Sequence, residues 1–518
     1  MQEDLSTKTL AELREIAKAQ GLKHITALRK GELLAALQQI NQSVSAPAVS
    51  PSEKKEEPTV STEAVTEHYQ NRYTERRTVP NRTGNTIRTI NRNSNPINGR
   101  TSSNPRTGEL QNAQGQLRTN YFRPPQRTEA KQDTFNKADY ADIDSGEEAR
   151  GILEIMPDGY GFIRSDNYLP GENDVYVAAS QIRRFNMKTG DFITGSKRVR
   201  TGNDKFAALL YVNQINDCPP SEAEVRKPFE TLTPIFPDSR LRLETANGPL
   251  STRIMDLVSP IGKGQRGMIV SPPKAGKTTL LKQVASAVLQ NHPEVHVIVL
   301  LIDERPEEVT DIKESIEGPN AEVIYSTFDE LPDNHRRVSE MVLERAKRLV
   351  EHKKDVIILL DSITRLTRAY NLTCVSSGRT LSGGLDPAAL HMPKKFFGAA
   401  RNMREGGSLT VLATALVETG SRMDDVVFEE FKGTGNMELV LDRKLSEKRV
   451  FPALDILKSG TRRDDLLLSE QEQTVSNYIH KAIQTQKPEE SVERIIEKFQ
   501  HTKNNGNLID FVLKAKYI

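Results

Sequence analysis

Short apolar runs alternate with stretches of helical periodicity along the second half of this 518-residue chain. Alternation of this kind indicates a parallel sheet that is covered by helices on both faces. The stretch beyond about residue 467 has helical spacing throughout. We therefore predict an α/β core over residues 251–518 with a helical C-terminus. The expected strands of this core are residues 268–270, 295–303, 323–326, 356–361, 409–413 and 437–441.

A different pattern fills residues 147–217, where short β-like runs are separated by turn residues. Several short strands at close spacing indicate a small β-barrel. Residues 218–250, with many prolines, are interpreted as a connector to the α/β core. The runs expected to form the barrel are residues 152–155, 161–163, 174–177 and 206–212.

The N-terminal part of the chain has two sections of unlike character. Leucines at helical spacing on either side of a turn-like Gly21-Leu22 predict a small helical module over residues 1–42. Residues 43–146 have no apolar periodicity, so they could not bury a core that offsets the entropy of ordering, and we predict a disordered insert. Between residues 71 and 127 this insert has eleven Arg, no Lys and two acidic residues, a local charge of 11 − 2 = +9. It is either a basic spacer or a segment that contacts RNA.

Composition narrows the class of protein further. The length suggests about three domains, and 36% hydrophobic with 27% charged residues fits folded domains diluted by a polar stretch. The only cysteines, Cys218 and Cys374, lack the spacing of a zinc site or a disulfide framework, and fit a reducing compartment. No signal peptide is evident, and no run approaches the ~18 apolar residues of a membrane span. We therefore expect a cytoplasmic protein with no membrane segment.

The most specific motif is S-P-P-K-A-G-K-T at residues 271–278, between an expected strand and an expected helix. This order of elements brings backbone N–H groups and the positive end of a helix to one point, which suits the phosphates of ATP. Lys277 would reach the β- and γ-phosphates, and the Thr278 hydroxyl would hold Mg²⁺. The motif departs from the usual pattern at its first position, which is Ser271 and not Gly. The alternative is a chance loop before an amphipathic helix.

Two acidic positions end apolar strands of the same core. Asp361 closes residues 356–361 at the edge where ligands bind, and could hold Mg²⁺ opposite Thr278. Its alternative is a helix-capping role. Glu304 is placed to polarise the water that attacks the γ-phosphate, while Asp303 points to the other side of the strand. Arg305 could then reach a phosphate. The alternative for these three residues is a solvated turn at the start of a helix.

Arginines cluster near the end of the core, at Arg443, Arg449 and Arg462. A planar guanidinium suits the stabilisation of charge on a transferring phosphoryl group. Such a group is often supplied by a neighbouring subunit, so these residues suggest a ring or filament. The alternative, from the residues alone, is that they are ordinary surface arginines.

The barrel region contains G-Y-G-F-I-R at residues 159–164, followed by D-V-Y-V at 174–177. On a strand, Tyr160, Phe162 and Arg164 share one face. Tyr176 on the next strand joins them, which places aromatic rings and a cation on the outside of the barrel. Unpaired bases can stack on such a surface. The pattern is typical of oligonucleotide-binding barrels of the cold-shock type, and its alternative is simple cross-strand packing.

Taken together, these motifs closely resemble the bacterial transcription termination factor Rho family. The resemblance covers the helical N-terminal module and the chain from about residue 151 to the C-terminal helices, and leaves out the insert. It implies an OB-fold barrel as the primary RNA site and a RecA-like P-loop ATPase core. Phe206 stands where Tyr is expected, which keeps stacking and loses a hydroxyl. The implied primary RNA contacts are Gly159, Tyr160, Gly161, Phe162, Ile163, Arg164, Asp174, Val175, Tyr176, Asp204, Lys205 and Phe206.

The resemblance also implies roles around the nucleotide. Glu304 and Lys277 would be catalytic, and Arg449 and Arg462 would act in trans within a homohexamer. Phe451 would stack on adenine. The implied ATP contacts are Gly262, Lys263, Gly264, Gln265, Arg266, Gly267, Lys274, Ala275, Gly276, Lys277, Thr278, Thr279, Arg305 and Phe451.

Two further loops have an implied role in gripping RNA inside the ring. Taken alone, each is only a loop of small residues with a cation beside it. Arg379 and Arg422 stand where Lys is common. The implied contacts of this secondary RNA site are Thr380, Leu381, Ser382, Gly383, Gly384 and Arg422.

The sequence thus predicts an ATP- and Mg²⁺-dependent 5′→3′ RNA translocase and helicase. It would bind nascent single-stranded RNA, hydrolyse ATP and release the transcript from an RNA polymerase elongation complex. One alternative is a non-catalytic RNA-binding regulator that uses its ATPase core as a scaffold. A DNA strand-exchange ATPase or a rotary ATPase subunit would share the core, but neither accounts for the barrel motif.

Overall fold

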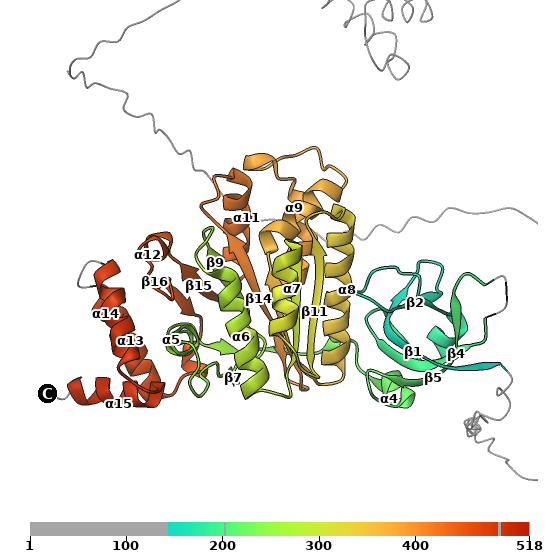
Figure 1. The fold of residues 1–518 in the computed structure, drawn as a ribbon, viewed down its shortest axis with the longest axis horizontal. Helices are drawn as coiled ribbons and strands as arrows, with labels where there is room; N and C mark the ends of the chain where they lie inside the picture. The colour runs from blue at the N-terminus through green and yellow to red at the C-terminus, as the bar shows by residue number, and fades with distance from the viewer. Residues whose placement is uncertain (1–142, 201, 203, 485–487, 517–518) are drawn as a thin grey trace, which may run out of the picture. The chain divides into compact units, whose positions relative to one another are not determined.

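The computed structural model describes residues 143–200, 202, 204–484 and 488–516 (Figure 1). All of them belong to one compact unit, Arg123–Ile518. The expected helical module at residues 1–42 and the expected insert, up to residue 142, lie outside the described residues. Within those residues, no helix is both long and apolar enough to cross a membrane.

The predicted small β-barrel is confirmed. Five strands close in the order β1-β2-β3-β5-β4. Their inward side chains, such as Leu153, Ile163 and Val177, are fully buried. The strand β4 escapes the sequence pattern because its inward positions include Gly195 beside Ile193, which leaves little apolar signal. The barrel consists of β1 Asp144–Ile155, β2 Gly161–Arg164, β3 Val175–Val177, α3 Ala179–Arg184, β4 Phe192–Arg198 and β5 Ala207–Ile215.

Short elements lead from the barrel to the core. The strands β7 and β8 pair in a small two-stranded sheet, and β6 joins the edge of the main sheet through β13. These elements are α4 Pro220–Val225, η4 Phe229–Thr231, β6 Pro234–Ile235, β7 Arg240–Leu241, α5 Leu250–Val258 and β8 Ile261–Gly262.

The core is a nine-stranded sheet whose main path runs β11-β10-β12-β14-β9-β15-β16. All six expected strands are present. The sheet is not wholly parallel as predicted, because β16 pairs antiparallel with β15 and β13 antiparallel with β14. The chain returns from β15 to β16 through the short helix α12, which cannot make the long crossover that a parallel pair requires. The strands are β9 Arg266–Ser271, β10 His296–Glu304, β11 Ala321–Thr327, β12 Asp355–Asp361, β13 Arg401–Met403, β14 Ser408–Leu416, β15 Met437–Leu441 and β16 Leu454–Thr461.

Helices cover both faces of this sheet, as the sequence predicts (Figure 1). The helices that follow β9 to β15 are α6 Lys277–Asn291, α7 Pro306–Ser315, α8 Pro332–Glu351, α9 Ile363–Thr373, α10 His391–Gly398, α11 Arg422–Lys432 and α12 Arg443–Glu447. Single 3₁₀ turns are η5 Ser382–Gly384, η6 Pro387–Leu390 and η7 Asp464–Leu466, and the chain ends in α13 Glu470–Gln484, α14 Pro488–Gln500 and α15 Asn505–Lys516.

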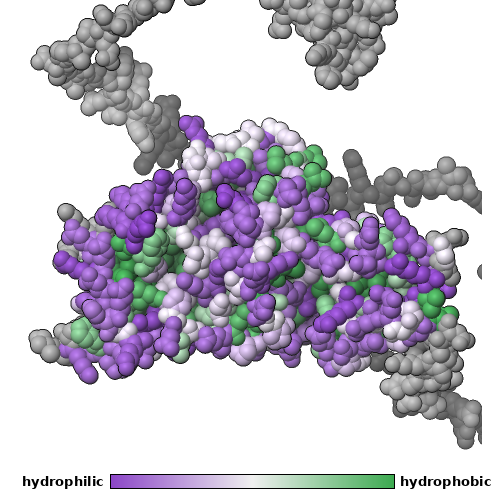
Figure 2. Space-filling model, viewed as in Figure 1, coloured by the Kyte–Doolittle hydropathy of each residue, from purple (hydrophilic) through white to green (hydrophobic). Residues whose placement is uncertain are grey.

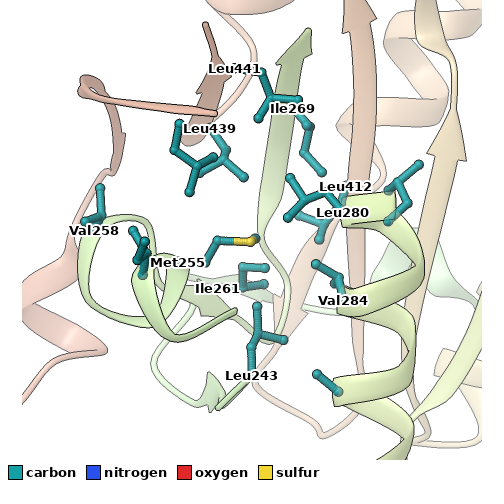
Figure 3. Close-up of a cluster of buried hydrophobic side chains, with 14 of the residues drawn as sticks. Leu243, Met255, Val258, Ile261, Ile269, Leu280, Val284, Leu412, Leu439 and Leu441 are labelled. Atoms are coloured by element: carbon teal, nitrogen blue, oxygen red, sulfur yellow. The ribbon is translucent and has the colours of Figure 1, made fainter. Parts of the chain in front are cut away.

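Alternate residues of the central strands pack into two separate apolar clusters, one on each face. On β10, Val299 and Leu301 belong to the cluster under α6, while Leu300 and Ile302 belong to the cluster under α8. Figure 3 shows Leu280 of α6 beside Ile269 on β9. On the face shown in Figure 2, hydrophilic residues cover most of the surface. Burial on both faces makes the sheet a rigid support for the loops at its strand ends.

A polar junction joins the barrel to the edge strand β11 of the core. The Asn167 side chain pairs with both backbone groups of Tyr325, donating to its O at 2.6 Å and accepting from its N at 2.9 Å. Next to it, the Tyr168 hydroxyl donates to Glu322, which also contacts His296 at 2.5 Å. The turn after β2 is therefore fixed to the α/β core at two adjacent positions.

We predict that Glu322→Gln destabilises the protein in a pH-dependent way. Burial alone would raise the pKa of Glu322, but the hydrogen bond with His296 and the charge of Arg345 lower this pKa from 4.5 to about 2. A lowered folded-state pKa stabilises the fold above the unfolded value and ceases to do so as the pH falls through the folded one. Glu322→Gln should therefore lower the free energy of unfolding by about 1–3 kcal/mol near pH 6, and by less near pH 3.

Urea unfolding of both proteins at the two pH values measures this difference. The exposed Glu317→Gln, in the loop before β11, is the matched control and should have little effect at either pH. An equal loss at both pH values would contradict the role assigned to the ionised Glu322 carboxylate.

Candidate functional site

The S-P-P-K-A-G-K-T segment forms a loop between β9 and α6. The helix begins at Lys277, and its N-cap residue Gly276 has a φ of 92° with open space where a Cβ would stand. No side chain in the described ranges caps this helix start. The N–H groups of its first turn therefore face the space above the loop, where an anion such as phosphate fits.

Lys277 lies between two buried carboxylates that come from different strands. Its Nζ is 2.8 Å from Glu304 Oε1 at the end of β10 and 2.7 Å from Asp361 Oδ1 at the end of β12. Burial acts to lower the pKa of Lys277, but the charges of Asp361 and Glu304 outweigh it and the pKa is raised. The three residues predicted to share the nucleotide site are thus in direct contact.

One carboxylate oxygen of Asp361 is available to bind a metal ion. Its Oδ1 accepts hydrogen bonds from Lys277 and from the Thr414 hydroxyl at 2.7 Å, whereas its buried Oδ2 has no hydrogen-bond partner among the residues that the structure describes. Carboxylate and hydroxyl oxygens are the ligands that Mg²⁺ prefers, so Asp361 and Thr278 fit the ion. Across the described chain, no cluster of three or more His, Cys, Asp or Glu residues could hold a metal by itself. The rest of the coordination would come from phosphate and water.

The prediction that Glu304 and Asp303 point to opposite sides of an extended strand is wrong, because Asp303 has a φ of 57° and the strand register shifts between Ile302 and Glu304. Glu304 is 3% exposed, whereas the Asp303 side chain is 40% exposed. Arg305 is exposed at the N-cap of α7. Sequence reasoning missed Arg365, in the first turn of α9, whose NH1 lies 3.6 Å from Glu304 Oε2 and 3.7 Å from Asp303 Oδ2. Its position four residues after Asp361 was the available signal.

A largely apolar cavity of about 300 Å³ lies beside the loop, between α5, α6 and the end of β15. Phe451 forms one wall and is 54% exposed, so its ring is available for stacking on a base. Thr279 and Gly276 also line this cavity. A second cavity next to it is lined by Lys274, Arg449 and Phe451 among others. The size and lining of the first cavity suit a nucleobase.

Residues 262–267 do not reach this site within one chain. They lie at the start of β9, about 17 Å of strand away from the loop at its end. Lys263 pairs there with Asp355 at 2.7 Å, and Gln265 is fully buried against Asn436. The predicted ATP contacts of Gly262, Lys263, Gly264, Gln265, Arg266 and Gly267 are therefore not met in the subunit that carries the loop.

Arg462 lies at this same far end of the sheet. Its backbone N donates to Asn436 O at 2.8 Å, and its side chain is exposed. Burial lowers the pKa of the neighbouring Arg266, and the charges of Arg401 and Arg462 lower it further. A cluster of three like charges of this kind favours an anion from outside the chain.

The predicted aromatic surface is present on the barrel. Tyr160, Phe162 and Tyr176 have ring centroids 5.7 to 6.0 Å apart, and Phe206 lies 5.1 Å from Phe162. We call these four rings the platform. Phe162 and Tyr176 are direct cross-strand partners. The next residue of β2, Ile163, faces the barrel interior and is fully buried. The predicted division into an outer aromatic face and an inner apolar face is confirmed.

The prediction that Arg164 forms an exposed cation on this face is wrong. Arg164 is 5% exposed, pairs with Asp174, and contacts Glu154 Oε2 at 2.6 Å. Asp174 is itself 1% exposed and accepts a hydrogen bond from the Gly171 N–H at 3.0 Å. The guanidinium can be buried because these two carboxylates neutralise its charge. Arg164 lies 4.9 Å from the Phe162 ring centre and supports the platform from below.

The hairpin before β5 completes the platform. Asp204 and Lys205 are exposed, and Lys205 Nζ lies 5.2 Å from the centre of the Phe206 ring. Gly159 precedes β2 with a φ of 88° and is half-buried. A cation beside a ring in this way suits contact with a nucleic acid backbone next to a stacked base.

The two loops expected to grip RNA lie side by side. A Cβ on Gly383 would stand 2.5 Å from Met423 N, so the first loop touches the start of α11 directly. Thr380, Ser382, Gly383, Gly384 and Arg422 are exposed, while Leu381 N donates to Leu385 O and closes the first loop.

Sequence reasoning missed the buried Asp424, which holds the second loop in place. Its carboxylate accepts from Thr419 Oγ1 at 2.6 Å and contacts Arg368 NH2 of α9 at 2.6 Å. Nothing in the local sequence distinguishes Asp424 from its exposed neighbour Asp425.

Comparison with family models divides the chain into three matched regions. Residues 4–40 match the Rho termination factor N-terminal domain, and residues 149–221 match its RNA-binding domain. Residues 251–461 match the nucleotide-binding domain of the ATP synthase alpha/beta family. The chain is also similar to a solved ATPase from a type III secretion system of pathogenic bacteria, with 20% identity and a TM-score of 0.47 over 61% of this chain and 93% of that one.

Curated relatives match over most of their length. The transcription termination factor Rho of Bacillus subtilis is 56% identical over 70% of this chain and 84% of the relative. Those of Pseudomonas aeruginosa and Aquifex aeolicus are 56% and 55% identical, and cover 88% and 83% of the relatives. With an RNA-binding domain and an ATPase nucleotide-binding domain in place, the chain belongs to the transcription termination factor Rho family.

Proposed function

We propose that this protein terminates transcription as an ATP-dependent 5′→3′ RNA translocase and helicase. The observation that carries the proposal is the presence, in one compact unit, of an aromatic platform on a barrel and of Lys277 in contact with Glu304 and Asp361. The first binds unpaired bases and the second binds and hydrolyses ATP. Its partners would be nascent single-stranded RNA and an RNA polymerase elongation complex.

The residues around Lys277 support ATP hydrolysis by positioning and charge. The first turn of α6 would bind the phosphates, and Lys277 would turn from its carboxylates toward the γ-phosphate. Glu304 would then be free to accept a proton from the attacking water. Mg²⁺, held by Thr278 and Asp361, would supply charge neutralisation on the phosphates. Arg365 would hold the Glu304 carboxylate in place.

The positions of Arg462 and Arg266 support a homohexamer. Arg462 and Arg266 lie at the opposite end of the sheet from the phosphate loop of their own chain, about 17 Å of strand away. They could therefore stabilise charge only on a nucleotide bound by another subunit. Arg449, also predicted to act in trans, lies instead beside Phe451 and Lys274 near the loop of its own chain. The exposed loops at Thr380 and Arg422 would face RNA in the centre of a ring.

Lys277→Ala should abolish RNA-stimulated ATP hydrolysis and leave RNA capture intact. The variant removes the cation that would contact the transferring phosphate, and we expect a loss of about a hundredfold or more in kcat. The platform is distant in sequence and on another domain, so RNA affinity should change by less than about twofold. ATP turnover with and without single-stranded pyrimidine RNA, and RNA binding by fluorescence anisotropy, measure the two effects.

The matched control is Lys282→Ala, on the same helix, where the side chain pairs with Asp311 at the surface. It should retain wild-type turnover. Turnover that persists in Lys277→Ala would refute the motor assignment. Stimulation of the wild type by DNA of the same sequence, with none by RNA, would favour a DNA-dependent ATPase.

The double variant Tyr160→Ala/Phe162→Ala should have the reverse effect. Base stacking on aromatic rings contributes about 1–3 kcal/mol per base, so RNA affinity should fall by about ten- to a hundredfold or more. ATP turnover at saturating RNA should persist because Lys277 and Glu304 are untouched. Tyr478→Ala, on an exposed ring of α13, is the control. Unchanged RNA affinity in the double variant would remove the platform from the capture step.

A further inference from the structure

Glu154 occupies a position on the barrel that the proposed function does not use. It lies on β1 directly opposite Phe162 in the β1–β2 register, and so shares the outer face with the platform. Its side chain is 15% exposed. A carboxylate beside a surface for RNA would repel phosphate unless other charges neutralise it.

Two arginines from different domains neutralise this carboxylate. Arg164, from the barrel, donates through Nε to Oε2 at 2.7 Å. Arg337, from α8 of the ATPase core, donates through NH2 to both Oε1 and Oε2 at 2.8 Å. Since Arg164 also lies 4.9 Å from the Phe162 ring centre, Glu154 connects the platform to α8 through one shared ion pair.

The start of α8 is connected in turn to the catalytic strand end. His335, two residues before Arg337, contacts Ser326 Oγ of β11 at 2.7 Å. The loop between β11 and α8 reaches the nucleotide site, because Phe328 N donates to the backbone O of Glu304 at 3.2 Å. A small displacement of α8 along its axis would therefore act on the residue that accepts the proton from water.

The barrel does not depend on this ion pair for its attachment. Asn167 and Tyr168 hold it to Tyr325 and Glu322 of β11 by separate hydrogen bonds. Arg337 is 34% exposed, whereas Tyr168 of the polar junction is only 6% exposed. The contact of Arg337 with Glu154 can therefore change while the barrel remains in place.

We propose that Glu154 is a positioning residue that transmits occupancy of the platform to ATP hydrolysis through Arg337. A base that stacks on Phe162 bears on the ring that Arg164 supports at 4.9 Å and weakens the hold of Arg164 on Glu154, which leaves the carboxylate to Arg337 and strengthens its pull on α8. The ligand thus has a different interaction energy with the two arrangements, which any shift between states requires. This inference rests on the proposed function, since it names the link between its two sites.

The test compares Arg337→Gln with Arg336→Gln in the full-length protein. Arg336 is the adjacent position on α8 and is similarly exposed; within the described part of the chain its ion pairs are with Asp333 and Glu340 of the same helix. Arg337→Gln should reduce RNA-stimulated kcat for ATP by about three- to tenfold, the range of coupling that residues between two sites carry. The RNA-free rate, the KM for ATP and the Kd for single-stranded RNA should stay within about twofold of wild type. Arg337→Lys, which keeps a cation beside Glu154, should retain most of the stimulation.

Three outcomes of this comparison would contradict the proposed coupling. Stimulation of Arg337→Gln equal to that of Arg336→Gln overturns the coupling and leaves the proposed function intact. A loss of RNA affinity that matches the loss of stimulation also overturns it, because the residue would then serve capture. A wild-type protein that RNA does not stimulate overturns the proposed function and this inference with it.

Discussion

The site depends on one cation held between two carboxylates. Lys277 begins α6, Glu304 ends β10 and Asp361 ends β12, so three segments distant in sequence meet at Nζ within 2.8 Å. Taking three charges out of water is costly unless each is neutralised. The loop geometry, the strand order that places β10 and β12 next to each other, and the apolar packing on both faces all serve to keep these groups together. In the proposed function, the cost of that arrangement would be recovered when phosphate replaces a carboxylate at Lys277.

The same physical constraint shapes the barrel. Arg164 and Asp174 are both almost fully buried, yet each finds an opposite charge, and Glu154 closes the set. A buried pair of this kind contributes little net stability, but it restricts the geometry of what it touches. Here it touches the Phe162 ring. The platform is therefore held by charge from beneath while its rings remain free to meet bases.

The sequence predicts some of these features and misses others. Periodicity locates the core strands and the outer aromatic face, because alternation is a local property of the chain. It cannot say that Arg164 is covered, since the covering Glu154 and Asp174 are ten residues away on either side and meet it only when the barrel closes. Arg365 and Asp424 escaped for the same reason, and β16 turned out antiparallel because the return through α12 is too short for a crossover. Features that depend on contacts between distant segments could be identified only from the folded structure.

The location of the barrel on the sheet limits how its signal can travel. It docks on β11, whereas the phosphate loop follows β9, with β10, β12 and β14 between them. These strands are buried on both faces, and close packing resists the sliding that a signal through the sheet would need. Helices and strand-end loops have no such restriction. Because β10 is the neighbour of β11 and ends at Glu304, the shortest route from barrel to chemistry runs along the loop that leaves β11, and α8 is the element that begins there.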